Sequence, residues 1–211
     1  MSLNPRNPVD GSWVVGDLTD TPLALDRTES VSTLRGIGAV AGTGVSVKEC
    51  VFGPFHQTVF TFNNCAIALA DQAGVVAYKG LKIYDFPAGA IQFLSAVADI
   101  DLTKSSAGVN ADWDGDFGVG TVTASNNATL SSTEQDILPT TPTPQAVAGV
   151  TTANGQSTIT EAGYVVDGTN TAVDMYINFL VDDADHDVTG TQCNLILNGT
   201  LKVNWLFLGD Y

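Results

Sequence analysis

Apolar and polar residues alternate one by one through much of this chain, and that alternation limits the folds open to it. A period of two places successive side chains on opposite faces of a β-strand. The pattern is clearest in residues 173–180, where we expect one set inside a core and most of the other set toward solvent or a partner. The core set is Val173, Met175, Ile177 and Phe179, and the other is Asp174, Tyr176, Asn178 and Leu180.

The same period predicts strands from residue 45 to the end of the chain. The alanine-rich stretch 66–73 is too short, and too closely flanked by strand patterns, for a helix. Leu81 and Ile83 are expected on one face of their strand, with Lys82 and Tyr84 on the other. In the last strand, Leu201, Val203, Trp205 and Phe207 form the inward set. The predicted strand segments are 45–52, 58–64, 65–70, 75–86, 90–103, 171–183 and 193–211.

Glycine, asparagine and proline divide these runs. Asn198-Gly199 between two alternating runs predicts a tight hairpin turn, because both turn positions need a positive φ. We also predict turns at 71–74, at Asn126-Asn127 and at Asn154-Gly155. Ser131 and Glu134 have the spacing of a capping box and predict at most one short helix near 132–137. Residues 138–145 (LPTTPTPQ) are predicted to form a stiff, extended proline–threonine linker.

The expected architecture is all-β, a single β-sandwich or jelly-roll-like domain over residues 37–211. Residues 1–36 lack sustained periodicity and are predicted to form an extended N-terminal arm. The 211-residue length fits one such domain. The first residues do not resemble a secretory signal, and the apolar stretch 36–47 is too short to cross a membrane.

The net charge of the chain narrows the classes of partner that we expect. The chain has 8 Lys and Arg against 23 Asp and Glu, for a formal net charge of −15. A surface this acidic repels nucleic acid and anionic membranes, so neither is an expected partner. Solubility is the general alternative reason for such an excess of acidic residues.

The residues that usually carry catalysis are sparse. His56 falls in a predicted turn and His186 in an acidic loop, and neither accompanies a known nucleophile or metal motif. A triad assembled in space stays possible, but we expect no enzyme and assign no catalytic residue. Cys50, Cys65 and Cys193 have no metal or redox spacing and are predicted to be buried free thiols.

Two acidic clusters are candidates for a metal site, and three aromatic residues are candidates for a sugar-binding site. Asp112, Asp114 and Asp116 stand at the alternate positions with which calcium loops begin, although the glutamate that closes such a loop is missing. The second cluster comprises Asp182, Asp183, Asp185 and Asp187 around His186. Solvated acidic turns are the alternative for both, so no metal or cofactor is assigned. Tyr78, Tyr84 and Trp113 are candidates for a sugar-binding platform, or else core residues.

Several segments resemble a family of virion proteins of tailed bacteriophages, over about residues 45–211. The ending GTLKVNWLFLGDY matches that family at Gly199, Thr200, Trp205, Leu208, Gly209, Asp210 and Tyr211. Similar stretches are 76–78, 82–87 and 89–91 in the centre, followed by 115–121, 129–131 and 134–139.

This resemblance implies a head decoration, or cement, protein. Such a protein is a β-sandwich, often a homotrimer, on the outer surface of the capsid, where it clamps neighbouring copies of the major capsid protein. An acidic protein suits that place, because the shell separates it from the packaged DNA. Two alternatives remain open: a tail- or fibre-associated adhesin that binds glycans, and a glycan hydrolase built on paired carboxylates.

Overall fold

The protein is all-β in the computed structural model, as the alternation predicts. The structure describes residues 38–72, 76–125, 127–157, 165–182, 188 and 193–209. The predicted arm, residues 1–36, lies outside these ranges. The strands are β1 (Ala39–Val40), β2 (Val45–Phe52), β3 (Phe55–Gln72), β4 (Val76–Asp85), β5 (Ala90–Lys104), β6 (Gly115–Gly120), β7 (Leu138–Thr143), β8 (Val150–Ser157), β9 (Val165–Asp167), β10 (Asp174–Asp182) and β11 (Cys193–Gly209).

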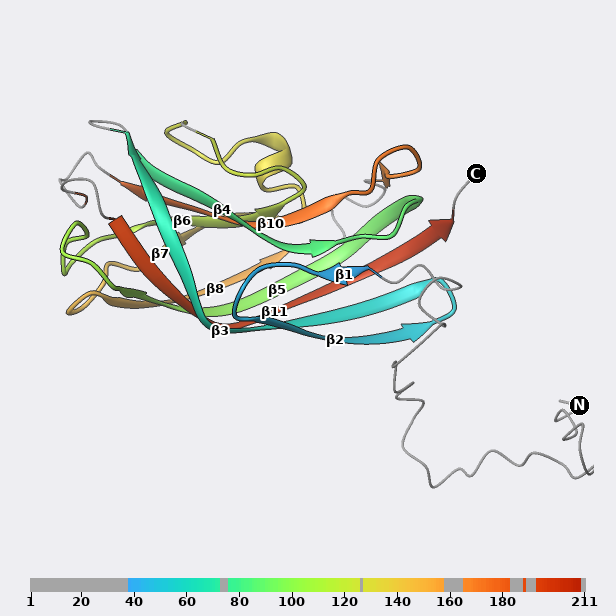
Figure 1. Ribbon diagram of the computed structural model, residues 1–211, viewed down its shortest axis with the longest axis horizontal. Helices are drawn as coiled ribbons and strands as arrows, with labels where there is room; N and C mark the ends of the chain where they lie inside the picture. The colour runs from blue at the N-terminus through green and yellow to red at the C-terminus, as the bar shows by residue number, and fades with distance from the viewer. Residues whose placement is uncertain are drawn as a thin grey trace, which may run out of the picture.

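The strands form two packed layers that share β3. One layer, here called the main sheet, has the order β2-β3-β11-β5-β8, with β9 paired to the start of β5. The other, the covering sheet, has the order β7-β6-β10-β4, with β1 paired to the end of β4. Figure 1 shows β4, β6 and β10 in one layer and β2, β3 and β11 in the other. The last residues of β3 pair with β4, so a single strand connects the two sheets.

The core lies between the layers and takes its residues from alternate positions of each strand. The predicted inward set of β10 is confirmed: Val173, just before the strand, and Met175, Ile177 and Phe179 are all buried. Leu201, Val203 and Trp205 of β11 are fully buried as well, whereas Phe207 is only partly buried against the core. β7 lies against β8, so the two sheets almost close into a barrel.

The Asn198-Gly199 prediction is wrong, because β11 runs through both residues without a turn. The ladder to β3 shifts register between Leu197 and Gly199, opposite Asn63 and Asn64. Gly199 has φ +118° and Asn64 has φ +54°. The positive φ that the sequence signalled is therefore used in a β-bulge, which bends a pair of long strands. β11 stays continuous because β3 and β5 pair with it on either side.

Two further predictions of irregular backbone are corrected. Residues 138–143 of the predicted linker form β7, which pairs with β6; Pro139 and Pro142 fit there because β7 is an edge strand. Asn154-Gly155 lies within β8. A Cβ on Gly155 would lie 2.9 Å from the ring of Phe117, so this glycine permits a close approach of the two sheets.

The short helix is confirmed as a single 3-10 turn, Ser132–Glu134. The Glu134 carboxylate accepts hydrogen bonds from the Ser131 amide at 2.8 Å and from the Ser125 hydroxyl at 2.6 Å. No helix in the described part of the chain is long and apolar enough to cross a membrane.

The segment around this turn covers the outer face of β10, where the alternation predicts solvent. Asn178 is fully buried there, and Leu180 packs with Val76, Ala124 and Leu130. The Asn178 side chain accepts a hydrogen bond from the Ala124 amide at 2.7 Å and donates to the carbonyls of Val122 and Glu134. One amide group therefore holds the covering segment against the sheet.

We expect Asn178→Leu to lower the free energy of unfolding by about 3 kcal/mol, because the buried Ala124 amide, the buried Glu134 carbonyl and the partly buried Val122 carbonyl each lose their bond to Asn178. Tyr176→Phe is the matched control on the same strand. It removes one partly buried hydroxyl that donates to Asp174 at 3.0 Å, and should cost about 1 kcal/mol. Urea denaturation of both variants measures the difference, and equal stability of Asn178→Leu and the native protein would contradict this role.

Candidate functional site

The two histidines, to which the sequence assigns no catalytic role, lie in different places. His186 lies outside the described residues, with Asp183, Asp185 and Asp187. His56 is not in a turn: it lies in β3, is 0% exposed, and stacks on Trp205 with ring centroids 3.9 Å apart. Its Nδ1 lies 2.6 Å from Glu49 Oε1, and its Nε2 has no hydrogen-bond partner among the described residues. A histidine enclosed in this way has no access to a substrate.

Glu49 connects this histidine to the covering sheet. Its other carboxylate oxygen accepts a hydrogen bond from the Tyr84 hydroxyl at 2.8 Å, and that hydroxyl accepts one from the Gly38 amide. Trp205 donates its indole N–H to Thr58 at 2.9 Å. This Glu49–His56–Tyr84 network therefore fastens β2 to β3 and to β4, and its role is structural.

The proposed sugar platform is not formed by the three predicted aromatics. Tyr84 and Trp113 are each only 1% exposed. Trp113 donates its indole N–H to the Gly149 carbonyl, and Tyr78 packs against the cluster around Leu180. Ile83 and Tyr84 are expected on opposite faces of β4, but both are buried where the ladder between β4 and β10 shifts register.

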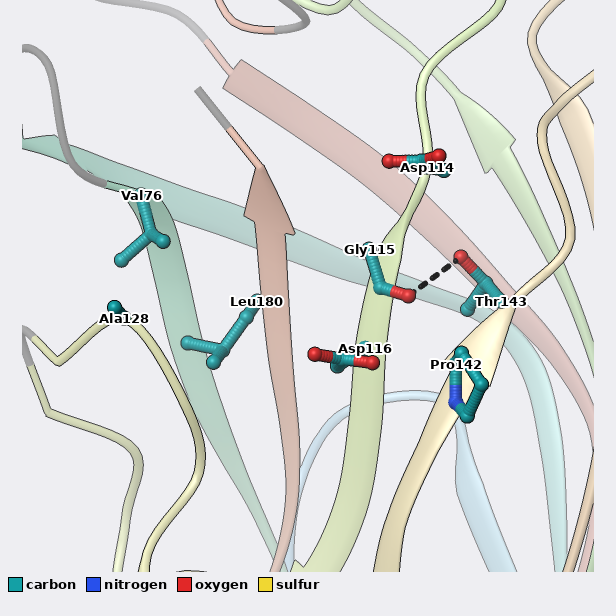
Figure 2. A pocket seen from close by; sticks show the side chains of 8 residues that line it. All are labelled: Val76, Asp114, Gly115, Asp116, Ala128, Pro142, Thr143 and Leu180. Carbon is teal, nitrogen blue, oxygen red and sulfur yellow. Dashed lines mark hydrogen bonds between the residues drawn. The ribbon is translucent and has the colours of Figure 1, made fainter. Parts of the chain in front are cut away.

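Asp114 and Asp116 line a pocket of about 230 Å³ between β6, β7 and the start of β4. Figure 2 shows Val76, Ala128 and Leu180 on its other side, and the Thr143 hydroxyl donating to the Gly115 carbonyl. Asp112 is exposed and does not line this pocket. Among the described residues, no three acidic, histidine or cysteine side chains come close enough to hold a metal ion.

Lys82 neutralises a pair of carboxylates, Asp85 and Asp174, that is separate from the two acidic clusters of the sequence analysis. Asp85 and Asp174 face each other across β4 and β10. The Lys82 Nζ lies 2.5 Å from Asp85 and 2.9 Å from Asp174. Its hydrogen bonds to the two carboxylates hold the pKa of Lys82 far above its ordinary value. Burial opposes ionisation of Asp174, but hydrogen bonds with Asp85, Lys82 and Tyr176 outweigh it and lower the pKa of that carboxyl.

Lys82→Met should destabilise the protein at neutral pH, by less than about 1 kcal/mol because these groups are about a third or more exposed. A lowered pKa for Asp174 means that its contribution is present above the unfolded pKa of about 3.9 and disappears as pH falls through the folded value. The loss in the variant should therefore shrink below about pH 4. Lys79→Met, an exposed change on the same strand, is the control; a loss that stays constant from pH 7 to pH 2 would contradict this account.

The burial of the cysteines agrees only in part with the prediction from the sequence. Cys65 and Cys193 are buried as predicted, whereas Cys50 is exposed on β2. None of the three forms a disulfide bond with another described residue. Burial raises the pKa of the Cys65 thiol, against a smaller opposing effect of a backbone hydrogen bond from Asn63. A thiol that is buried and protonated reacts slowly.

Native protein should accordingly show one fast-reacting thiol toward a water-soluble disulfide reagent, and all three thiols after denaturation. Cys50→Ser should remove the fast reaction. More than one fast thiol in the native protein, or a fast reaction that survives in Cys50→Ser, would contradict the assignment.

Cys50 belongs to a broad outward face of the main sheet, which sequence reasoning did not identify. Cross-strand pairing aligns its side chains in rows perpendicular to the strands. One row is Ser46, Thr61, Thr200, Asp99 and Asn154. The next is Lys48, Val59, Lys202, Val97 and Gln156. The third is Cys50, Gln57, Asn204 and Ser95.

These rows, together with Asp101, define the docking face discussed below. Most of its side chains are short and uncharged, and hydrogen bonds tie Gln57 to Asn204 at 3.0 Å and Asn204 to Ser95 at 2.8 Å. Its charged groups are Lys48, Lys202, Asp99 and Asp101, which balance one another on a chain of net charge −15. A face with few charges that balance one another is suited to contact with another protein surface.

Comparison with protein-family models, with curated proteins and with solved structures found no match to this chain. The segments that carry the resemblance to phage virion proteins occupy central places in the fold. Gly199, Thr200, Trp205 and Leu208 lie in β11, and further segments lie in β4 and β6. Asp210 and Tyr211 lie outside the described residues.

Proposed function

We propose that this chain is a non-enzymatic structural protein of a phage virion, a decoration protein that binds the outer surface of the capsid. The observation that carries the proposal is the docking face, a five-stranded surface with balanced charge on a strongly acidic protein. Its proposed partner is the major capsid protein, and a homotrimer is the proposed assembly. The resemblance in β4, β6 and β11 supports this choice of partner.

The acidic charge supports the same location. A protein outside the shell has no need of the basic groups that release counterions from DNA phosphates. The docking face brings few charged groups into a contact, so the rest of the surface carries the excess that keeps the free protein soluble. No cofactor, nucleic acid or membrane has a part in this function.

The glycan-binding alternative has less support. A sugar platform presents aromatic rings at the surface, and two of its three candidate rings, Tyr84 and Trp113, are buried. The three rows that define the docking face contain no aromatic residue, and beyond them Phe52 is exposed at the end of β2. Binding to host envelope glycans, with none to heads, would nevertheless establish the adhesin function in place of decoration.

The direct test uses expanded heads of the encoding phage, prepared without this protein. Native protein should bind them to saturation in a fixed ratio and raise their resistance to heat. Thr61→Arg places a long charged side chain on β3 in the first row of the docking face and should weaken binding about tenfold or more, which is about 1.4 kcal/mol. Thr171→Arg, at an exposed position before β10, is the matched control and should bind like the native protein.

Three outcomes of this experiment decide the proposal. Failure of the native protein to bind heads would overturn the function. Equal binding by the native protein and Thr61→Arg would keep the function but exclude the docking face. Protection of Cys50 from the thiol reagent in head-bound protein would support both.

A further inference from the structure

The free edge of β2 is a second feature of the main sheet that points to a partner. Among the described residues, β3 is the one strand to which β2 is hydrogen-bonded. β2 has eight residues, VSVKECVF, with no proline or glycine and no register shift along its ladder. A long regular edge of this kind is a template for another strand.

Other strand edges in the described structure are short or blocked. β1 has two residues and β9 has three. β7 contains Pro139 and Pro142, which cannot donate hydrogen bonds. β8 lies against β7, and its Thr151 hydroxyl donates to the Pro144 carbonyl. Among the described residues, β2 carries two of the charges with which natural sheets guard an edge, Lys48 and the inward Glu49, but it has no proline and no bulge.

The ladder identifies which backbone groups of β2 are exposed. Hydrogen-bonded and non-bonded pairs alternate along an antiparallel ladder. Gly44 and Asn63 form a bonded pair, in which the Asn63 amide donates to the Gly44 carbonyl at 2.9 Å. Counting in steps of two from Gly44, the residues of β2 at positions 46, 48, 50 and 52 lie in bonded pairs. Val47 and Val51 therefore lie at non-bonded positions. Their N–H and C=O groups therefore point away from β3, along the open edge.

The edge is held in place before any partner arrives. The Glu49–His56–Tyr84 network anchors the middle of β2, and the Phe207 amide of β11 donates to the Pro54 carbonyl at the tip of the β2–β3 hairpin, at 2.8 Å. An edge fixed in this way loses little conformational entropy when a strand adds to it.

The side chains on the outer face of β2 indicate the chemistry of the partner. Lys48 presents a positive charge there, and Phe52 is 81% exposed. The one carboxylate of β2, that of Glu49, is turned inward and is 5% exposed. This strip of the acidic protein thus offers a cation and an aromatic ring beside an open backbone edge.

We propose that the β2 edge binds an extended strand of the capsid subunit, which adds to the main sheet and carries an acidic residue facing Lys48 and an apolar residue facing Phe52. The inference rests on the proposed function, and the edge is continuous with the docking face through Ser46, Lys48 and Cys50. A second copy of this chain fits less well. It would bring two Lys48 side chains onto one sheet face and join two bodies of net charge −15.

The test compares Val47→Pro with Val47→Thr in binding to the same expanded heads. Proline removes the outward N–H of Val47 without removing a bond to β3, whereas threonine keeps the N–H and the branched shape. We expect Val47→Pro to bind about tenfold more weakly than Val47→Thr, which is about 1.4 kcal/mol. Circular dichroism and thermal unfolding check that both variants fold.

Hydrogen exchange of the native protein tests the edge without any substitution. The amides of Val47 and Val51 should exchange quickly in free protein and slowly on heads. Lys48→Glu should also weaken binding, while Lys79→Glu, a charge reversal on β4, should not. If Val47→Pro does not fold, the exchange measurement decides.

Each result separates this inference from the proposed function. Heads that bind native protein, Val47→Pro and Val47→Thr equally, with no slowing of exchange at Val47 and Val51, would overturn the strand addition and leave the decoration function standing. Native protein that does not bind heads would overturn both. A dimer in sedimentation that Val47→Pro dissociates would assign the edge to a second copy and also overturn the inference.

Discussion

The structure depends on the pairing of β11 with β3 on one side and β5 on the other. This 17-residue strand supplies Leu195, Leu197, Leu201, Val203 and Trp205 to the core from one face. Its registers with β3 and β5 align the outward residues in rows, so the same hydrogen bonds that build the core also build the docking face. The bulge at Gly199 bends β11 together with β3, whose far end joins the covering sheet. A shift of one residue in this ladder would exchange core and surface along the whole strand.

Polar chemistry inside this fold is used for construction. Asn178 holds the covering segment on β10, Glu134 closes the 3-10 turn, and the Glu49–His56–Tyr84 network ties β2 to both layers. Buried polar groups of this kind are costly unless they are hydrogen-bonded, so they specify one arrangement of the layers. They also hold the β2 edge and the docking face in place at the surface. The buried polar and titratable side chains thus act indirectly, by holding in place the surfaces that face a partner.

Much of the fold follows from local pattern, and most of the site does not. The strands, the core set of β10, the short 3-10 turn and the burial of two of the three thiols are predictable from alternation, capping and residue type. Trp113, Tyr84 and His56 show the limit, because packing against segments distant in the chain decides that each of these rings is buried. The docking face was missed for a related reason. Its rows combine residues from β2, β3, β11, β5 and β8, which are far apart in the chain.

The sequence by itself determined the all-β class, the faces of most strands and the positive φ at Gly199. A period of two states which residues share a face, and glycine or asparagine states where the backbone can bend. Only the tertiary structure decided that Asn198-Gly199 is a bulge within one strand, that the proline–threonine segment is an edge strand, and that Asn178 lies under a covering segment. The physical reason is the same in each case. A local conformation such as a positive φ or an extended proline is compatible with several long-range pairings, and the ladder formed with distant strands selects one.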